Sequence, residues 1–144
     1  MNEKEIRFFT EDITYRLQGK EVLRRGIVQL VKEKDYQLGA INIIFCSDMF
    51  LKRYNKAYLK HDYFTDVIAF DLSEEKKMIS GDIYISLDRV RENAKMYHVL
   101  IKNEIARVII HGILHLMGME DSTDELKRAM KIEEDKFLSV IMSG

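Results

Sequence analysis

The segment IKNEIARVIIHGILHLM, residues 101–117, is the most apolar stretch of the chain. Its apolar residues recur at the spacing of an α-helix, and the glycine that follows, Gly118, is a typical C-terminal cap. A helix with apolar residues on most of its sides is stable when other elements cover it. We therefore predict a helix over residues 101–117 that lies in the middle of the packing.

The rest of the chain predicts strands and helices around this helix. Strands are expected at residues 5–10, 40–46, 65–72 and 81–86, and helices at 20–34, 49–59, 88–98 and from residue 122 onward. Runs of strands followed by runs of helices indicate an α+β or mixed α/β fold with one central sheet.

The spacing of apolar residues in two of these helices predicts their buried sides. In the helix at 88–98, the residues expected to face inward are Val90, Ala94 and Tyr97. In the last helix, the residues expected to face inward are Leu126, Met130, Phe137 and Ile141.

The composition fits one domain spanning residues 1–144, and 47% apolar residues are enough for a packed core. The formal net charge of -1 does not indicate a nucleic-acid partner, although it leaves room for a local basic patch. The single cysteine, Cys46, excludes an internal disulfide and is expected to be a buried thiol. The N-terminus lacks the apolar core of a signal peptide. The chain has no run of about 18 apolar residues, so no membrane span is predicted. We expect a cytoplasmic protein.

Two histidines of the central helix, His111 and His115, are four residues apart and therefore lie on one face. Both imidazoles can point at one ion, and two ligands from one rigid helix lose little entropy on binding. Imidazoles in so apolar a run are costly without polar partners, which favours a metal site over two unrelated core histidines. The sequence predicts one Zn²⁺, or another divalent transition metal.

A third ligand is expected from the chain after Gly118. Asp121 lies far enough past the glycine for the chain to turn back, and nearby alternatives are Glu120, Asp124 and Glu125. Three protein ligands leave one position open, as catalytic zinc sites require.

The residue after the first histidine argues against a protease. In the helical zinc motif His-Glu-x-x-His, the glutamate is the general base. Here that position is Gly112, which cannot take a proton. The segment has the ligand spacing of a zinc protease without its base.

Three segments, in order along the chain, resemble the YbeY family of metal-dependent bacterial endoribonucleases linked to ribosomal RNA maturation. They are TDVIAF at 65–70, GDIYIS at 81–86 and HGILHLMG at 111–118. The resemblance covers most of the chain and implies a single mixed β-sheet of about four strands flanked by helices, with the metal-binding helix central. It makes His111 and His115 metal ligands, and it places Asp121 where most members carry a third histidine.

The resemblance also implies an activity. It describes a zinc-dependent endoribonuclease that prefers single-stranded RNA and acts in 3′-end maturation of small-subunit ribosomal RNA and in ribosome quality control. Ribosomal RNA and small-subunit ribosomal proteins are the implied partners, with no DNA and no membrane. In such an enzyme Zn²⁺ polarises a phosphoryl oxygen or lowers the pKa of bound water. The sequence leaves open whether water or the ribose 2′-hydroxyl attacks.

Two positions depart from the family pattern near the expected substrate. Phe64 replaces a proline before the TDV segment, and Leu59 stands where many members have an arginine that helps to hold the phosphate. Lys60 and His61 are adjacent, and either can replace the missing charge.

Other residues are candidates for binding RNA. Thr65 and Asp66 begin the strand at 65–72, before its apolar core, and they either line the cleft or only make hydrogen bonds at the start of the strand. Basic residues at spacings of three to four form a strip that faces either an RNA backbone or solvent: Lys52, Arg53, Lys56 and Lys60. Two other functions stay open, namely a metal-stabilised ribosome-binding module without significant catalysis and another metal-dependent hydrolase.

Overall fold

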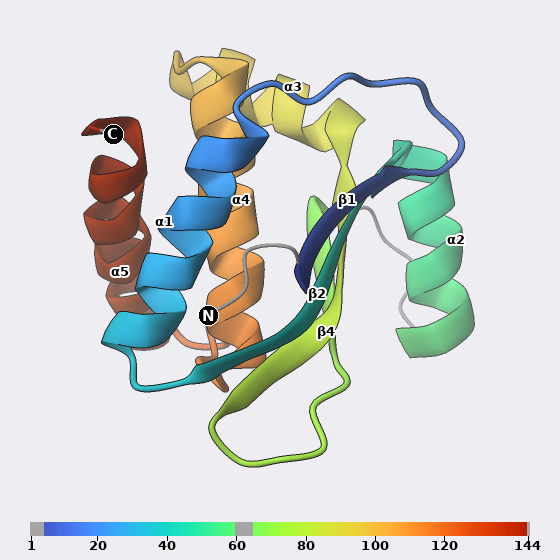
Figure 1. Ribbon diagram of the computed structural model, residues 1–144. Coiled ribbons are helices and arrows are strands. Elements are labelled where there is room, and N and C mark those ends of the chain that lie inside the picture. Colours follow the sequence, from blue (N-terminus) through green and yellow to red (C-terminus); the bar gives the residue numbers. More distant parts are fainter. Residues whose placement is uncertain (1–4, 60–64, 144) are drawn as a thin grey trace.

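The computed structural model describes residues 5–59 and 65–143, and its helices lie on both sides of one four-stranded sheet (Figure 1). Helices α1, α4 and α5 lie on one side of the sheet and α2 lies on the other (Figure 1). The elements, in chain order, are β1 (Ile6–Thr10), α1 (Lys20–Glu33), β2 (Gln37–Cys46), α2 (Asp48–Leu59), β3 (Val67–Asp71), β4 (Met78–Ser86), α3 (Leu87–Tyr97), α4 (Ile101–Leu116) and α5 (Asp124–Ser143).

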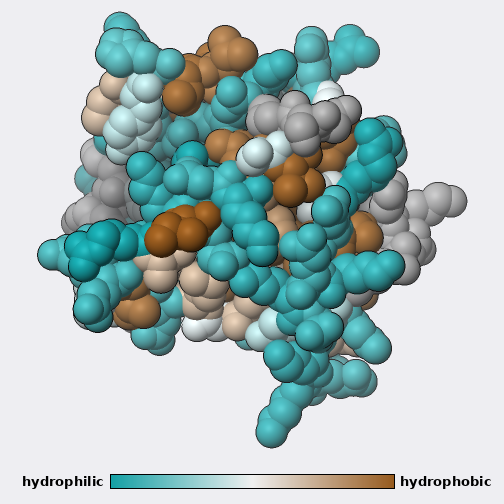
Figure 2. Space-filling model, turned by 90° about the vertical axis from the view of Figure 1, so that its left-hand side faces the viewer, coloured by the Kyte–Doolittle hydropathy of each residue, from teal (hydrophilic) through white to brown (hydrophobic). Residues whose placement is uncertain are grey.

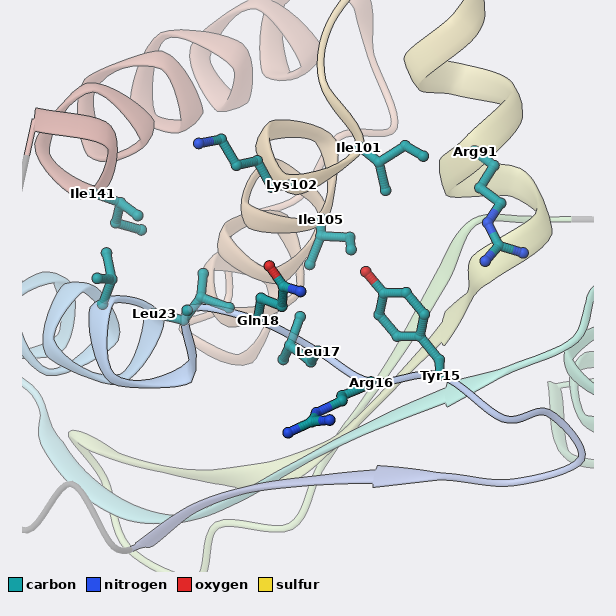
Figure 3. A pocket seen from close by; sticks show the side chains of 12 residues that line it. Tyr15, Arg16, Leu17, Gln18, Leu23, Arg91, Ile101, Lys102, Ile105 and Ile141 are labelled. Atoms are coloured by element: carbon teal, nitrogen blue, oxygen red, sulfur yellow. The ribbon is translucent and has the colours of Figure 1, made fainter.

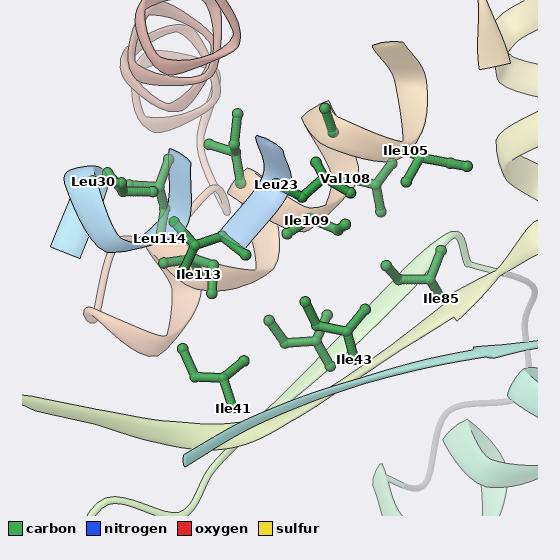
Figure 4. Close-up of a cluster of buried hydrophobic side chains, with 14 of the residues drawn as sticks. Leu23, Leu30, Ile41, Ile43, Ile85, Ile105, Val108, Ile109, Ile113 and Leu114 are labelled. Carbon is green, nitrogen blue, oxygen red and sulfur yellow. The ribbon is translucent and has the colours of Figure 1, made fainter. Parts of the chain in front are cut away.

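The sheet has the strand order β1-β2-β4-β3 and is mixed. Strands β1, β2 and β4 are parallel, and β3 pairs with β4 in the antiparallel direction at one edge. Side chains alternate between the faces of a strand, so buried isoleucines of β2 and β4 line the face toward α4. Figure 4 shows Ile41, Ile43 and Ile85 there, and Ile83 faces Gly112 of α4. The predicted α+β fold with one mixed four-stranded sheet is confirmed.

Helix α4 is the centre of the core, as its sequence predicts. It contacts helices α1, α3 and α5 and strands β3 and β4. Its buried residues occupy most of its circumference: Glu104, Ile105, Ala106, Val108, Ile109, Ile110, Gly112, Ile113, Leu114 and Leu116. Figure 4 shows five of them in the core, Ile105, Val108, Ile109, Ile113 and Leu114. The two histidines are only half-buried, so they mark the side of α4 that opens to solvent.

A smaller cluster lies on the opposite face of the sheet, under α2. Cys46 is fully buried there, and this burial, with nearby carboxylates, raises the pKa of its thiol to about 12. A thiol that is buried and protonated at neutral pH is inert, which agrees with the structural role expected for it. Phe50, Phe70 and Tyr84 pack against this cluster, where Phe50 and Tyr84 also stack on Tyr54 and Phe70 meets Tyr54 edge-on.

The structure corrects several details of the sequence prediction. Strand β2 begins at Gln37 rather than at residue 40, because a register irregularity between Leu38 and Ile41 interrupts the apolar pattern without ending the strand. Two residues predicted to face inward do not: Leu126 is 36% exposed and Tyr97 is 61% exposed. Each lies in a terminal turn of its helix, where neighbouring elements no longer cover that side.

Among the described residues, no helix is long and apolar enough to cross a bilayer.

Candidate metal centre

His111 and His115 project from the open side of α4 toward each other. Their Nε2 atoms are 2.9 Å apart, and the two rings meet nearly edge to face. The i,i+4 spacing on one helix dictates this arrangement. The two side chains are therefore placed together by the helix itself.

The turn after α4 brings Asp121 back to the histidines. Gly118 has a positive φ of 90°, its N–H donates to His115 O at 2.9 Å, and the Met119 N–H donates to Leu114 O at 3.0 Å. This is a Schellman turn, which glycine adopts without strain. It reverses the chain, so that Asp121 Oδ2 lies 3.4 Å from His111 Nε2 and 3.6 Å from His115 Nε2.

The three side chains fit a divalent transition metal. Their ligand atoms all lie within 4.8 Å of one another. Two atoms that each bind a tetrahedral ion at about 2.1 Å are separated by about 3.4 Å, close to the separations of 3.4 and 3.6 Å between Asp121 and the two histidines, whereas the two Nε2 atoms are nearer to each other, at 2.9 Å. In the described part of the chain, no other group of histidine, cysteine and acidic side chains meets this criterion, and the alternative ligands considered from the sequence do not join it: Glu120, Asp124 and Glu125.

A glutamate that sequence reasoning missed supports the first histidine. Glu134, on α5, places Oε2 at 2.6 Å from His111 Nδ1, so this ring nitrogen is occupied and Nε2 is left for the ion. Carboxylates that orient ligating histidines in this way are usual in metal sites. The sequence contained a signal for this contact. Glu134 lies four residues after Met130 and three before Phe137, so helical spacing places its carboxylate on the side of the last helix that was predicted to face inward.

Charges around Glu134 hold this arrangement together. Arg107 donates to Glu134 Oε1 at 3.1 Å and to Asp135 Oδ1 at 2.6 Å. Burial by itself would lower the pKa of His111, but the hydrogen bond and charge of Glu134, with the charge of Asp121, raise it overall. The imidazole therefore lies in a strongly negative environment, which also favours a metal cation.

Gly112 is required by packing as well as by chemistry. A Cβ at this position would lie 2.9 Å from Cγ2 of Ile83, on β4. A side chain as large as glutamate has no space between α4 and the sheet. The structure thus gives a physical reason why this helix cannot carry the base of a zinc protease.

Two cavities adjoin at two of the three candidate ligands, His111 and Asp121, whereas His115 lines neither of them. One, of about 490 Å³, extends toward α5, and the other, of about 320 Å³, extends toward β3 and α3. Both are lined by the same six residues: Tyr97, Glu104, Arg107, His111, Asp121 and Glu134. The candidate centre is therefore open to a ligand from two sides.

The second cavity contains two carboxyl groups outside the ligand set. Asn93 Nδ2 lies 3.2 Å from Asp66 Oδ2 and 3.4 Å from Glu104 Oε2, bridging them. Burial raises the pKa of Glu104, which is 4% exposed. These groups can hold or move a proton near the centre, a function that Gly112 cannot have.

The other residues predicted to bind substrate have different outcomes. Asp66 lines the second cavity, whereas Thr65 is not among its lining residues. Lys60 and His61 lie outside the described residues. The basic residues of α2 lie across the sheet from α4 and line neither cavity: Lys52, Arg53 and Lys56.

A third cavity, larger than the other two, lies elsewhere. It measures about 610 Å³ and shares no lining residue with the other two. Figure 3 shows its aliphatic floor, with Leu23, Ile105 and Ile141, and the cationic side chains of Arg91 and Lys102 at its edge. Its lining has no carboxylate and no imidazole, so it lacks the groups that bind a transition metal.

Comparison with known proteins gives consistent matches. The sequence model of the family described as Endoribonuclease YbeY matches residues 5–142. A protein named Endoribonuclease YbeY from Cytophaga hutchinsonii is 44% identical over 140 residues, which cover 97% of this chain and 98% of that protein. One of the same name from Amoebophilus asiaticus is 39% identical over 138 residues, covering 96% and 94%. The solution structure of TM1509 from Thermotoga maritima has a TM-score of 0.67 and 28% identity, covering 96% of this chain and 89% of that one.

Proposed function

The chain belongs to the Endoribonuclease YbeY family, and we propose that it is a zinc-dependent endoribonuclease that prefers single-stranded RNA. Family membership makes it a nuclease that acts on phosphodiester bonds, with a role in ribosomal RNA processing. The proposal assigns it more narrowly to 3′-end maturation of small-subunit ribosomal RNA and to ribosome quality control.

The observation that carries the proposal is the group formed by His111, His115 and Asp121, two members of which, His111 and Asp121, line both cavities. We propose these three residues as the ligands of one Zn²⁺. Two nitrogens and one carboxylate oxygen suit this ion, and three protein ligands leave a position open. With an aspartate where most family members have a histidine, the site carries one more negative charge, which also suits other divalent transition metals.

The protein's own residues have separate parts in this mechanism. When bound, the ion supplies positive charge that polarises a phosphoryl oxygen and acidifies a water. Glu134 orients His111, and Arg107 fixes Glu134. Asp66 and Glu104, on the other side of the centre, are placed to hold or transfer a proton at their carboxylate oxygens. We leave the choice between water and the 2′-hydroxyl as nucleophile open.

Substrate binding near β3 is part of the same proposal. Asp66 lines the second cavity, and the residues just before it in sequence include Lys60, His61 and Thr65. We propose that these three contact the RNA, with Lys60 or His61 replacing the charge of the arginine missing at Leu59. If Lys60→Ala leaves both the affinity for RNA and its salt dependence unchanged, this replacement is wrong.

A cleavage assay tests the activity. The purified protein, loaded with Zn²⁺, is incubated with a single-stranded RNA and with a duplex of the same sequence. We expect fragments from the single strand, far fewer from the duplex, and none after chelation or in His111→Ala. Intact RNA in the presence of metal-loaded protein would instead support a ribosome-binding module.

The partners and location follow from the same function. We propose ribosomal RNA as the natural substrate and small-subunit ribosomal proteins as neighbours during cleavage. Because ribosomal RNA is matured in the cytoplasm of bacteria, the source of the relatives named above, the proposal places the protein there. Co-sedimentation of the protein with small-subunit precursors, resistant to moderate salt, is the expected result.

A further inference from the structure

The two cavities at the metal centre differ at their far ends. Because they share six lining residues, they adjoin and form one groove that passes over His111 and Asp121. The end toward β3 is lined by Asp66 and Asn93, an acid and an amide. The end toward α5 is lined by Lys127 and Lys131, two cations. The two ends of the groove therefore differ in charge, and the candidate centre lies between them.

The two lysines at the α5 end are available to bind an anion. Lys127 and Lys131 are exposed and lie one helical turn apart on α5, whose face is mostly hydrophilic (Figure 2). No ion pair among the described residues includes either of them. Arg107 lines the same cavity, but Glu134 and Asp135 already bind its guanidinium. The cationic charge that an RNA strand meets at this end thus comes from the two lysines.

An exposed aromatic ring stands beside the centre. Tyr97, the last residue of α3, lines both cavities and is 61% exposed. No ring–ring contact among the described residues includes it. The chain next to it is also apolar and exposed, at Met96, Val99 and Leu100. Exposed aromatic rings near cationic side chains that bind the backbone are the usual platform for unpaired bases, and here Lys127 and Lys131 are those side chains.

We propose that a single RNA strand lies along this groove, with one unpaired base stacked on Tyr97 and backbone phosphates bound by Lys127 and Lys131. This inference rests on the proposed nuclease function and adds to it the residues that position the substrate. Stacking needs a base that is out of a duplex, so Tyr97 also gives a physical reason for the preference for single strands. The lysines fix which way the strand extends from the centre.

Binding measurements with Tyr97 variants test the stacking. Removing a stacking ring costs about 1–3 kcal/mol per base, so Tyr97→Ala is expected to weaken the Kd for a single-stranded RNA by roughly 5- to 150-fold. Tyr97→Phe keeps the ring and should bind like the wild type. A series of RNAs is then tested, each with one abasic nucleotide at a different position along the strand. At one position the abasic RNA should weaken binding to the wild type but not to Tyr97→Ala, a result that a merely structural role of Tyr97 would not produce.

Salt dependence tests the lysines. Each phosphate contact to a single strand contributes about 0.7 to the slope of log K against log salt. The double variant Lys127→Ala/Lys131→Ala should therefore lower this slope by about 1.4. The matched control, Arg128→Ala/Lys136→Ala, removes the same charge from the same helix outside both cavities and should change the slope much less. Equal effects of the two double variants would contradict the assignment.

The outcomes separate this inference from the proposed function. If the wild type cleaves RNA and the Tyr97 and lysine variants bind and cleave as it does, the nuclease function stands and the substrate path is wrong. If the wild type neither binds nor cleaves RNA, the proposed function itself fails. Circular dichroism of each variant confirms that a weakened Kd does not reflect unfolding.

Discussion

Glu134 Oε2 lies 2.6 Å from His111 Nδ1, joining α5 to the open side of α4. This contact fixes the orientation of the imidazole, and removing such a partner typically lowers metal affinity by about 10–100-fold. Glu134→Gln is therefore expected to weaken Zn²⁺ binding by about that factor, as measured by competition with a chromophoric chelator. Glu125→Gln makes the same chemical change on the exposed first turn of α5, and it should bind zinc like the wild type.

The third ligand is tested by changing Asp121. Asp121→Ala removes the carboxylate that lies 3.4 Å from His111 Nε2, so the zinc content per chain, measured by elemental analysis after dialysis, should fall well below one. Asp121→His supplies a nitrogen instead and should retain zinc. The control variant Asp124→Ala changes an aspartate three residues further along the chain, and its zinc content should stay at one ion per chain. Full occupancy in Asp121→Ala would mean that another group is the third ligand.

How much the sequence could predict depended on the range of the interactions. The central helix and the two histidines follow from local spacing, and the turn at Gly118 follows from one residue type; the structure has all three. The candidate ligand group joins residues only ten positions apart, from His111 to Asp121, so the sequence could suggest it. Family resemblance added the substrate class, which spacing alone could not supply.

The parts that sequence reasoning missed depend on contacts across the fold. Glu134 is 23 residues from His111, and only the packing of α5 against α4 brings them together. Tyr97 follows the apolar pattern of α3 but lies where that helix ends, so its exposure could not be read from periodicity. Basic residues do recur along α2, but the sheet separates this helix from the candidate metal centre. That separation depends on the topology of the fold and could not be predicted from spacing.

Gly112 should be intolerant of a side chain. In Gly112→Ala the new Cβ would lie 2.9 Å from Ile83 Cγ2, an atom fixed close to the backbone of β4. Overpacking of this kind costs about 1–3 kcal/mol, while replacing a helical glycine by alanine regains up to about 1 kcal/mol. We expect a net loss of about 0–2 kcal/mol in the free energy of unfolding, measured with urea on metal-free protein.

A reverse substitution calibrates that experiment. Ala129→Gly, at an exposed position of α5, measures the helix-propensity contribution without any core contact and should cost about 1 kcal/mol. A Gly112→Ala variant more stable than the wild type would contradict the close packing of α4 on the sheet.

The buried carboxyl of Glu104 should make stability depend on pH. Burial raises the pKa of Glu104, the charges of Asp66 and Glu134 add to this, and the hydrogen bond from Asn93 and the charge of Arg107 oppose it. The folded state therefore prefers the protonated form. Its contribution to stability is present below the unfolded-state pKa of about 4.3 and is lost as the pH rises through the higher folded-state pKa.

Glu104→Gln removes this titration. Its free energy of unfolding, relative to that of the wild type, should rise between pH 4.5 and pH 7.5 in urea titrations of the metal-free protein. Glu92→Gln, on the exposed side of α3, should show no such trend. A relative stability of Glu104→Gln that falls over this range would mean that Asn93 and Arg107 outweigh burial.

His98 follows Tyr97 and ends α3 in a strained backbone conformation. Its φ of 56° is left-handed, and the turn it makes lets the Val99 N–H donate to Ala94 O at 3.0 Å. A residue with a Cβ pays about 1–2 kcal/mol for this conformation, whereas glycine does not but loses more entropy on folding. His98→Gly should therefore be more stable than His98→Ala, which keeps the Cβ, by a few tenths to about 1 kcal/mol in urea unfolding. If the two variants are equally stable, the left-handed conformation of residue 98 is not strained.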